Sequence, residues 1–195
     1  MRSIKLIGQK LFNHCKESKS LAKTIKILSK QESDTLRCYA TYLISLNKDI
    51  KISEKLEQSR NLVADKHFGV REIVWMALRP EMEKELSKSI KILIGWTKDS
   101  DENIRRFTTE SIRPRGLWCK HIETLKENPE QALPILEELK SDQSKYVQDS
   151  VGNWLNDASK SKPEFVVALC KKWELELPTI ETKKVLKRAL RTIQK

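Results

Sequence analysis

The sequence is poor in the residues that interrupt helices. Its 195 residues include only 5 glycines and 6 prolines, and aromatic residues make up 6% of the chain. Leucine, lysine and glutamate are abundant by contrast. Because glycine and proline are the strongest helix breakers, this composition predicts an all-α protein whose helices are joined by brief turns.

Long apolar runs are also missing. None approaches the roughly 20 residues that a transmembrane helix needs. The start of the chain passes directly into an amphipathic pattern that carries Lys10 and Lys16, which is unlike a signal peptide. We therefore expect no membrane partner and a location in the cytoplasm.

The sequence has few residues that bind metals or act as nucleophiles in known motifs. Its 4 cysteines lie far apart with no CxxC pair, and its 3 histidines are well separated. No glycine-rich phosphate loop, nucleophile elbow or HExxH motif is present. We expect buried thiols in a reducing compartment, no metal site and no cofactor.

What the chain does have is positive charge, with a formal net charge of +11. Lysines are spread along the chain, as on any solvated helical surface, whereas 6 of the 11 arginines lie between residues 71 and 115. A guanidinium has a planar fork that fits phosphate oxygens. The arginine cluster therefore indicates a polyanionic partner.

A short pattern occurs three times: an aspartate, four residues, a β-branched apolar residue, then a basic or amide residue. The three aspartates are Asp65, Asp99 and Asp142, 34 and 43 residues apart. A large apolar residue precedes each aspartate by three positions, and apolar residues follow at helical spacing. This interval is typical of two-helix repeats, which stack to cover their apolar faces. We predict one domain, residues 1–195, an α-α superhelix of about 10 to 12 helices in HEAT-like repeats, clearest over 50–159.

The periodicity also predicts helix boundaries. The predicted helices span residues 3–16, 20–30, 33–46, 50–63, 69–78, 81–97, 102–112, 117–127, 130–140, 145–159, 163–174 and 179–193. In this scheme Arg71, Arg105 and Arg106 recur near the N-terminal turns of the helices that follow the aspartates. Equivalent positions in stacked repeats form a stripe, which predicts a positive groove if the stripe lies on the concave face.

The densest basic segment follows the second aspartate. Arg113-Pro-Arg115-Gly forms a predicted turn, and Trp118 and Lys120 follow it. Trp118 is a candidate for stacking in a groove beside these arginines, and the alternative is a core position between helices. Together with Arg105 and Arg106, these arginines and Lys120 predict phosphate contacts. An alternative is that some of them bind carboxylates within the protein, such as Asp99 and Asp101.

One carboxylate is a candidate for catalysis. In Phe68-Gly-Val-Arg-Glu72 an aromatic residue stands four positions before a glutamate near a predicted helix start. In a first turn, backbone N–H groups and the helix dipole would stabilise its anion beside a cationic ligand. The alternative is an ordinary first-turn glutamate, with Phe68 packing against the turn.

These motifs resemble a known family. The segment around Glu72, the run from Trp96 to Arg106, the Arg113-Pro-Arg115 turn with Trp118, and Val151-Gly-Asn-Trp-Leu-Asn-Asp157 resemble the bacterial DNA alkylation repair family of HEAT-like repeat glycosylases, AlkC and AlkD. The resemblance covers about residues 60–195 and is closer to the AlkC side.

The resemblance implies a function and roles for particular residues. It implies removal of cationic N3- or N7-alkylated purines from double-stranded DNA held along a concave basic groove, without a metal. Glu72 matches the catalytic carboxylate, Phe68 its neighbouring tryptophan, and Arg106 an arginine that holds the DNA backbone. Asn153 stands where AlkD has a groove tryptophan, and Trp154 beside it is a candidate for the same surface.

Three functions follow as expectations. The first is a monomeric alkylpurine DNA glycosylase that associates with the bacterial nucleoid when bound to DNA. The second is a paralogue without catalytic activity that recognises DNA shape or branched DNA through phosphates. The third is a HEAT-type scaffold whose basic face binds an acidic protein.

Overall fold

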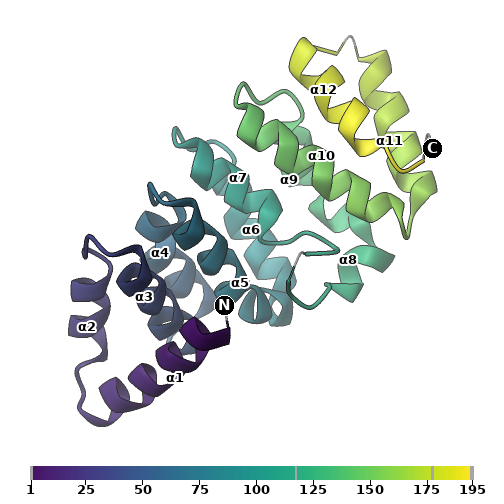
Figure 1. Ribbon diagram of the computed structural model, residues 1–195. Helices are drawn as coiled ribbons and strands as arrows, with labels where there is room; N and C mark the ends of the chain where they lie inside the picture. The colour runs from purple at the N-terminus through teal and green to yellow at the C-terminus, as the bar shows by residue number, and fades with distance from the viewer. Residues whose placement is uncertain (1, 117, 177, 194–195) are drawn as a thin grey trace. The chain divides into compact units, whose positions relative to one another are not determined.

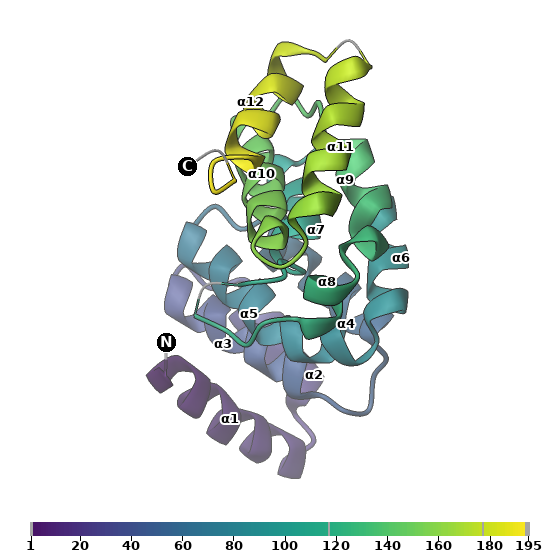
Figure 2. The ribbon, with the colours of Figure 1, turned by 90° about the vertical axis from the view of Figure 1, so that its right-hand side faces the viewer.

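The computed structural model describes residues 2–116, 118–176 and 178–193. All regular secondary structure within these residues is helical, as the composition predicted, with twelve α-helices and one short 3₁₀ helix (Figures 1 and 2). Over the same residues we find no helix that combines the length and the apolar character needed to cross a bilayer. The chain divides into two compact units, Met1–Glu85 and Leu86–Lys195.

The first unit is centred on one helix that contacts each of the others. Its helices are α1 (Arg2–Glu17), α2 (Leu21–Leu28), α3 (Asp34–Leu46), α4 (Ile52–Val63) and α5 (Phe68–Lys84). Helix α3 packs against α1, α2, α4 and α5. Gly8 allows α1 to approach closely, because a Cβ atom at this position would lie 2.7 Å from the Cβ of Tyr42.

The second unit is centred on α10. Its elements are α6 (Leu86–Trp96), α7 (Glu102–Glu110), α8 (Glu123–Glu127), η1 (Pro129–Ala132), α9 (Leu133–Leu139), α10 (Lys145–Ser159), α11 (Pro163–Leu175) and α12 (Ile180–Ala189). Helix α10 packs against α7, α9, α11 and α12, and Figure 1 shows it alongside α12. Its apolar stripe of Val147, Val151 and Leu155 is fully buried, as the sequence pattern predicted.

The three repeated aspartates form the same turn. The Oδ1 atoms of Asp65, Asp99 and Asp142 each accept a hydrogen bond of 2.8 Å from the backbone N–H two residues later. This side-chain bond replaces a backbone partner in the turn between two helices. The predicted helix–turn–helix repeat is therefore confirmed at all three positions.

Two helix predictions were wrong. We expected a break at Pro80, but α5 continues through it to Lys84. Pro80 is exposed, and the last turn beyond it is held by Glu81, whose carboxylate binds Lys55 and Lys84. We also expected a helix from residue 117, whereas α8 begins at Glu123 and the described residues between α7 and α8 form no helix (Figures 1 and 2).

Candidate nucleic-acid interface

The arginines that follow the aspartates hold the turns of the repeats. Nη1 of Arg71 donates to the carbonyl oxygens of Asp65 and Lys66 at 2.6 and 3.2 Å. Nη1 of Arg105 donates in the same way to Asp99 and Ser100, at 2.9 Å each. Both arginines therefore bind backbone carbonyl groups of the turn that precedes their own helix.

Arg105 also binds the aspartate of the following repeat. Its Nε and Nη2 atoms donate to the Asp142 carboxylate at 2.6 and 3.1 Å. The hydrogen bond to Asp142 raises the pKa of Arg105 more than burial lowers it. The carboxylate that pairs with Arg105 is thus Asp142 and not Asp99 or Asp101. The Arg105 side chain is 17% exposed.

Arg113 is a structural residue, which corrects the prediction that it contacts DNA. It is 7% exposed. It donates to Oε1 of Glu110 and, through Nε and Nη2, to Oδ2 of Asp157, at 2.9, 2.9 and 2.6 Å. Burial lowers the pKa of Arg113, but the two carboxylates raise it by more. A guanidinium enclosed by two carboxylates is unsuited to phosphate binding.

Arg106 shares the Glu110 carboxylate and lies against an aromatic ring. Its Nη2 is 3.5 Å from Oε2 of Glu110, and its guanidinium carbon is 4.3 Å from the centre of the Tyr146 ring. Stacking on a tyrosine and pairing with a buried carboxylate hold the guanidinium in one orientation. The Arg106 side chain lies where α7 packs against α10, and 13% of it is exposed.

Arg115, Trp118 and Lys120 come together in one pocket. It has a volume of about 690 Å³ and is also lined by His121 and Lys160. Arg115 donates to the hydroxyl of Ser161 at 2.7 Å. Trp118 is 83% exposed. The structure thus brings together three of the residues predicted from the basic segment.

The two candidates on α10 differ in exposure. Asn153 is partly exposed, whereas Trp154 is fully buried and donates its indole N–H to the Ile112 carbonyl at 3.0 Å. Trp154 was a candidate for the same surface as Asn153, but its ring is enclosed in the core of the second unit. Its position continues the buried stripe of Val147 and Val151.

A basic groove between α10 and α12 was not predicted from the sequence. It has a volume of about 430 Å³ and contains one carboxylate, Asp149. The five cationic side chains that line it are Lys145, Lys184, Lys187, Arg188 and Arg191. The helical spacing of four of these residues, at positions 184, 187, 188 and 191, places them on one helix face. This pattern could have predicted a basic surface here.

Gly152 determines how Arg188 lies in this groove. A Cβ atom at residue 152 would be 2.8 to 2.9 Å from the Cβ, Cγ and Cδ atoms of Arg188. Without it, the arginine stem crosses the surface of α10, and Nη2 reaches Oδ1 of Asp149 at 2.6 Å. The groove thus holds a positioned guanidinium beside the exposed Lys184 and Lys187, while Lys145 pairs with Asp149 at 2.9 Å. A cluster of this kind is suited to phosphates.

In the first unit, Glu72 is half-buried on α5 and Oε2 accepts the indole N–H of Trp75 at 2.9 Å. Trp75 is 2% exposed, so a core side chain orients the carboxylate. Phe68, at the start of the same helix, is 66% exposed and its ring lies 5.3 Å from that of His67. The candidate carboxylate and an accessible aromatic ring therefore lie on consecutive turns of one helix.

The expected first-turn position of Glu72 was wrong. Helix α5 begins at Phe68, so Glu72 is its fifth residue, beyond the turn in which N–H groups lack helical partners. The helix start cannot be what fixes the carboxylate. Trp75 performs that role instead.

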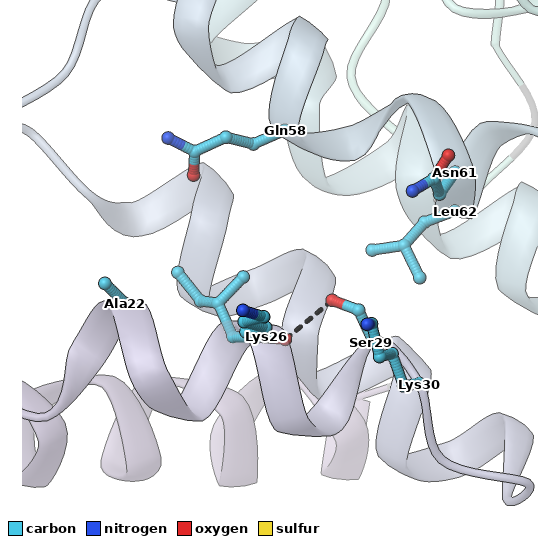
Figure 3. Close-up of a pocket in the computed structure, with 8 residues that line it drawn as sticks. Ala22, Lys26, Ser29, Lys30, Gln58, Asn61 and Leu62 are labelled. Carbon is cyan, nitrogen blue, oxygen red and sulfur yellow. Dashed lines mark hydrogen bonds between the residues drawn. The ribbon is translucent and has the colours of Figure 1, made fainter.

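A further groove in the first unit contains none of the predicted site residues. Side chains of α2 and α4 face each other across it, as Figure 3 shows. Its volume is about 330 Å³, and its cations are Lys26 and Lys30. The described residues contain no group of three or more His, Cys, Asp or Glu side chains placed to hold a metal ion.

Comparisons with known proteins agree with this fold. The uncharacterised protein YhaZ of Bacillus subtilis is 40% identical over 119 residues, which are 61% of this chain and 33% of YhaZ. AlkD2 from Streptococcus mutans has a TM-score of 0.79 and 29% identity over 97% of this chain and 88% of its own. The α-α solenoid of helical repeats is thereby confirmed.

A second similar structure was solved with DNA. It is the Pseudomonas fluorescens alkylpurine DNA glycosylase AlkC bound to DNA containing an abasic site analogue, with a TM-score of 0.76 and 24% identity over 91% of this chain and 48% of that one. This chain thus spans about half of that AlkC chain and a third of YhaZ. A family model described as DNA alkylation repair enzyme matches residues 7–189. The chain belongs to the DNA alkylation repair enzyme family.

Proposed function

We propose that this protein is a DNA glycosylase that hydrolyses the N-glycosidic bond of cationic N3- or N7-alkylated purines in double-stranded DNA. The observation that supports it most is the bond from the Trp75 indole to Glu72, which orients a half-buried carboxylate beside the exposed ring of Phe68. Membership of the DNA alkylation repair enzyme family supports alkylated DNA as the substrate class.

The chemistry requires one anionic group. An alkylated purine carries a positive charge that its departure neutralises, so the enzyme need not protonate the leaving base. The positive charge then develops on the sugar, where an oriented carboxylate stabilises it and positions the attacking water. Glu72 performs this role in the proposal, and Phe68 supplies an apolar surface next to the reacting sugar.

DNA binding is assigned to the cations that the second unit presents. Arg106, Arg115 and Lys120 contact phosphates, joined by the α10–α12 groove with Arg188. Arg71 and Arg105 act indirectly, by holding the turns that carry neighbouring residues. The protein acts as a monomer in the bacterial cytoplasm, where its DNA substrate is found.

The test is release of 3-methyladenine and 7-methylguanine from methylated duplex DNA. Glu72→Gln keeps the shape of the side chain and removes its charge, so release is expected to fall by at least about 100-fold while DNA binding persists. Glu57→Gln, at an exposed position of α4, is the control with the same charge change. Equal release by Glu72→Gln and the unmodified protein would disprove the role of Glu72.

A second function is favoured by one observation. The groove formed by α10 and α12 is built entirely from residues outside the Glu72 region. A DNA-binding protein that does not excise bases could use this groove without any contribution from Glu72. The DNA-binding function without catalysis would be supported if duplex binding is salt-sensitive and the unmodified protein releases no alkylated base. Failure of both release and binding at low salt would leave the scaffold function.

A further inference from the structure

The loop between α7 and α8 is closed at its base and presents a tryptophan at its tip. The backbone N–H of Ile122 donates to the carbonyl of Pro114 at 3.1 Å, and both residues are buried. Trp118 is 83% exposed, whereas Trp75, Trp96, Trp154 and Trp173 are each at most 6% exposed. The loop therefore holds its large aromatic ring outside the core.

The backbone of Trp118 is strained as well as exposed. Its φ is 63°, in the left-handed region that a bulky L-residue rarely adopts. The conformation costs free energy, and an exposed ring recovers little of it by burial. Such strain concentrates at ligand-binding sites, where the surrounding structure maintains it. The turn at this position could be formed by a smaller residue, and packing does not account for the ring, which is 83% exposed.

The charge around the ring selects the ligand. Arg115, Lys120 and Lys160 line the same pocket, and its one carboxylate is Asp157. That carboxylate already binds Arg113 at 2.6 Å and Lys160 at 3.2 Å. Arg115 donates to a neutral hydroxyl rather than to a carboxylate. The pocket is therefore positive and fits a ligand that carries both anionic groups and a flat ring.

We propose that Trp118 is a stacking platform for one unpaired base of DNA, with Arg115, Lys120 and Lys160 holding the phosphates on either side of it. The inference deepens the proposed function and depends on it only in taking DNA as the ligand. A paired base inside a duplex is covered on both faces by its neighbours. An unpaired base can expose a face to Trp118, so this loop distinguishes disrupted DNA from intact duplex.

The test measures how DNA quenches the tryptophan fluorescence of the protein. A base can stack on Trp118, which is 83% exposed, but not on the other four tryptophans, which are buried, and Trp118→Phe gives the emission of those four. The protein is titrated with an intact duplex, the same duplex carrying a single-nucleotide bulge, and a single strand. The bulged duplex and the single strand should quench the emission. Trp118→Ala should weaken binding to these two by about tenfold and leave the intact duplex unchanged, while Trp118→Phe retains most of the affinity.

Two controls separate stacking from charge. Lys120→Ala should weaken binding to all DNA forms, and Lys23→Ala, at an exposed position of α2, should leave it unchanged. A strand of abasic residues carries the phosphates without bases and should not quench the emission. Trp118→Ala and the unmodified protein should bind this strand with equal affinity. Equal quenching by the abasic strand, or equal affinity of Trp118→Ala for the bulged duplex, would overturn the stacking role.

The proposed glycosylase activity can fail separately. The fluorescence experiment uses unmodified bases and measures binding alone. Loss of base release with retained quenching would refute the glycosylase and keep the stacking platform. Retained release with no dependence of binding on Trp118 would refute the platform and keep the glycosylase.

Discussion

Arg37 and Asp65 form a buried ion pair that joins two successive turns of the first unit. The bonds from Nε and Nη2 to the carboxylate are 2.6 and 2.9 Å long, and each side chain is 7% exposed. The hydrogen bond to Asp65 raises the pKa of Arg37, while burial lowers it by less. Nη1 donates to the backbone carbonyl oxygens of Gln31 and Glu32. Arg37 therefore holds both the turn before its own helix and the turn that contains Asp65.

Removal of the Asp65 carboxylate should strongly destabilise the protein. Asp65→Ala leaves the Arg37 guanidinium buried without its counter-charge, which costs about 3–5 kcal/mol of unfolding free energy. Asp49→Ala is the control, because the Lys16–Asp49 pair is 54% and 69% exposed and should contribute less than about 1 kcal/mol. Urea denaturation measures both. Equal losses in the two variants would show that Arg37 does not depend on Asp65.

The repeated aspartates predicted the turns correctly, but not the roles of the arginines after them. Periodicity identifies which residues share a helix face, and it placed Val147 and Val151 in the core. It cannot show whether an arginine faces a ligand or a carboxylate, because Asp142 lies 37 residues beyond Arg105 in sequence. Arg37 lies outside the three copies of the pattern, and it makes the same kind of bond to the aspartate of the following turn.

The aromatic candidates show the same limit. Trp118 follows the arginine-rich segment and Trp154 follows Asn153, yet one is 83% exposed and the other fully buried. The difference arises because Trp154 continues a helical stripe, whereas Trp118 follows Pro114 and Gly116 in a segment without a helix. A proline and a glycine in the sequence mark that segment, but the distance over which the chain stays irregular depends on tertiary contacts.

A methyl group at residue 152 should weaken DNA binding through Arg188. Gly152→Ala places a Cβ atom against the Arg188 stem and displaces the guanidinium from the α10 surface. If Arg188 contacts a phosphate, affinity for duplex falls and the slope of log affinity against log salt decreases by about 1. Filter binding over a range of salt concentrations measures both quantities.

Gly95→Ala is the matched control for this substitution. A Cβ atom there would meet nothing within 4 Å apart from its chain neighbours and the adjacent helix backbone, so the binding slope should not change. The unfolding free energy should instead rise by about 0.5–1 kcal/mol, because alanine is favoured over glycine inside a helix. A change in salt slope with Gly95→Ala would mean that the assay responds to general helix stability rather than to Arg188.

Thiol reactivity should distinguish one cysteine from the other three. Burial raises the pKa of Cys38 and of Cys170 to about 11, and Cys15 is 2% exposed. Cys119 lies in the α7–α8 loop and is partly exposed. A chromogenic disulfide reagent at about pH 8 should therefore modify Cys119 in the native protein and all four thiols after denaturation. A fast-reacting thiol that persists in Cys119→Ser would contradict this assignment.

Replacing Trp118 with a residue that tolerates left-handed backbone should stabilise the protein. Asparagine adopts positive φ at low cost, and the ring that Trp118→Asn removes is 83% exposed. The unfolding free energy should rise by about 1 kcal/mol, the lower end of the cost of such strain. Trp118→Phe keeps a bulky side chain at the same φ and should give no gain. Thermal denaturation of the two variants measures the difference, and a loss of stability in Trp118→Asn would show that the ring contributes to folding. A gain accompanied by weaker binding to the bulged duplex would identify a residue that lowers stability in order to bind DNA.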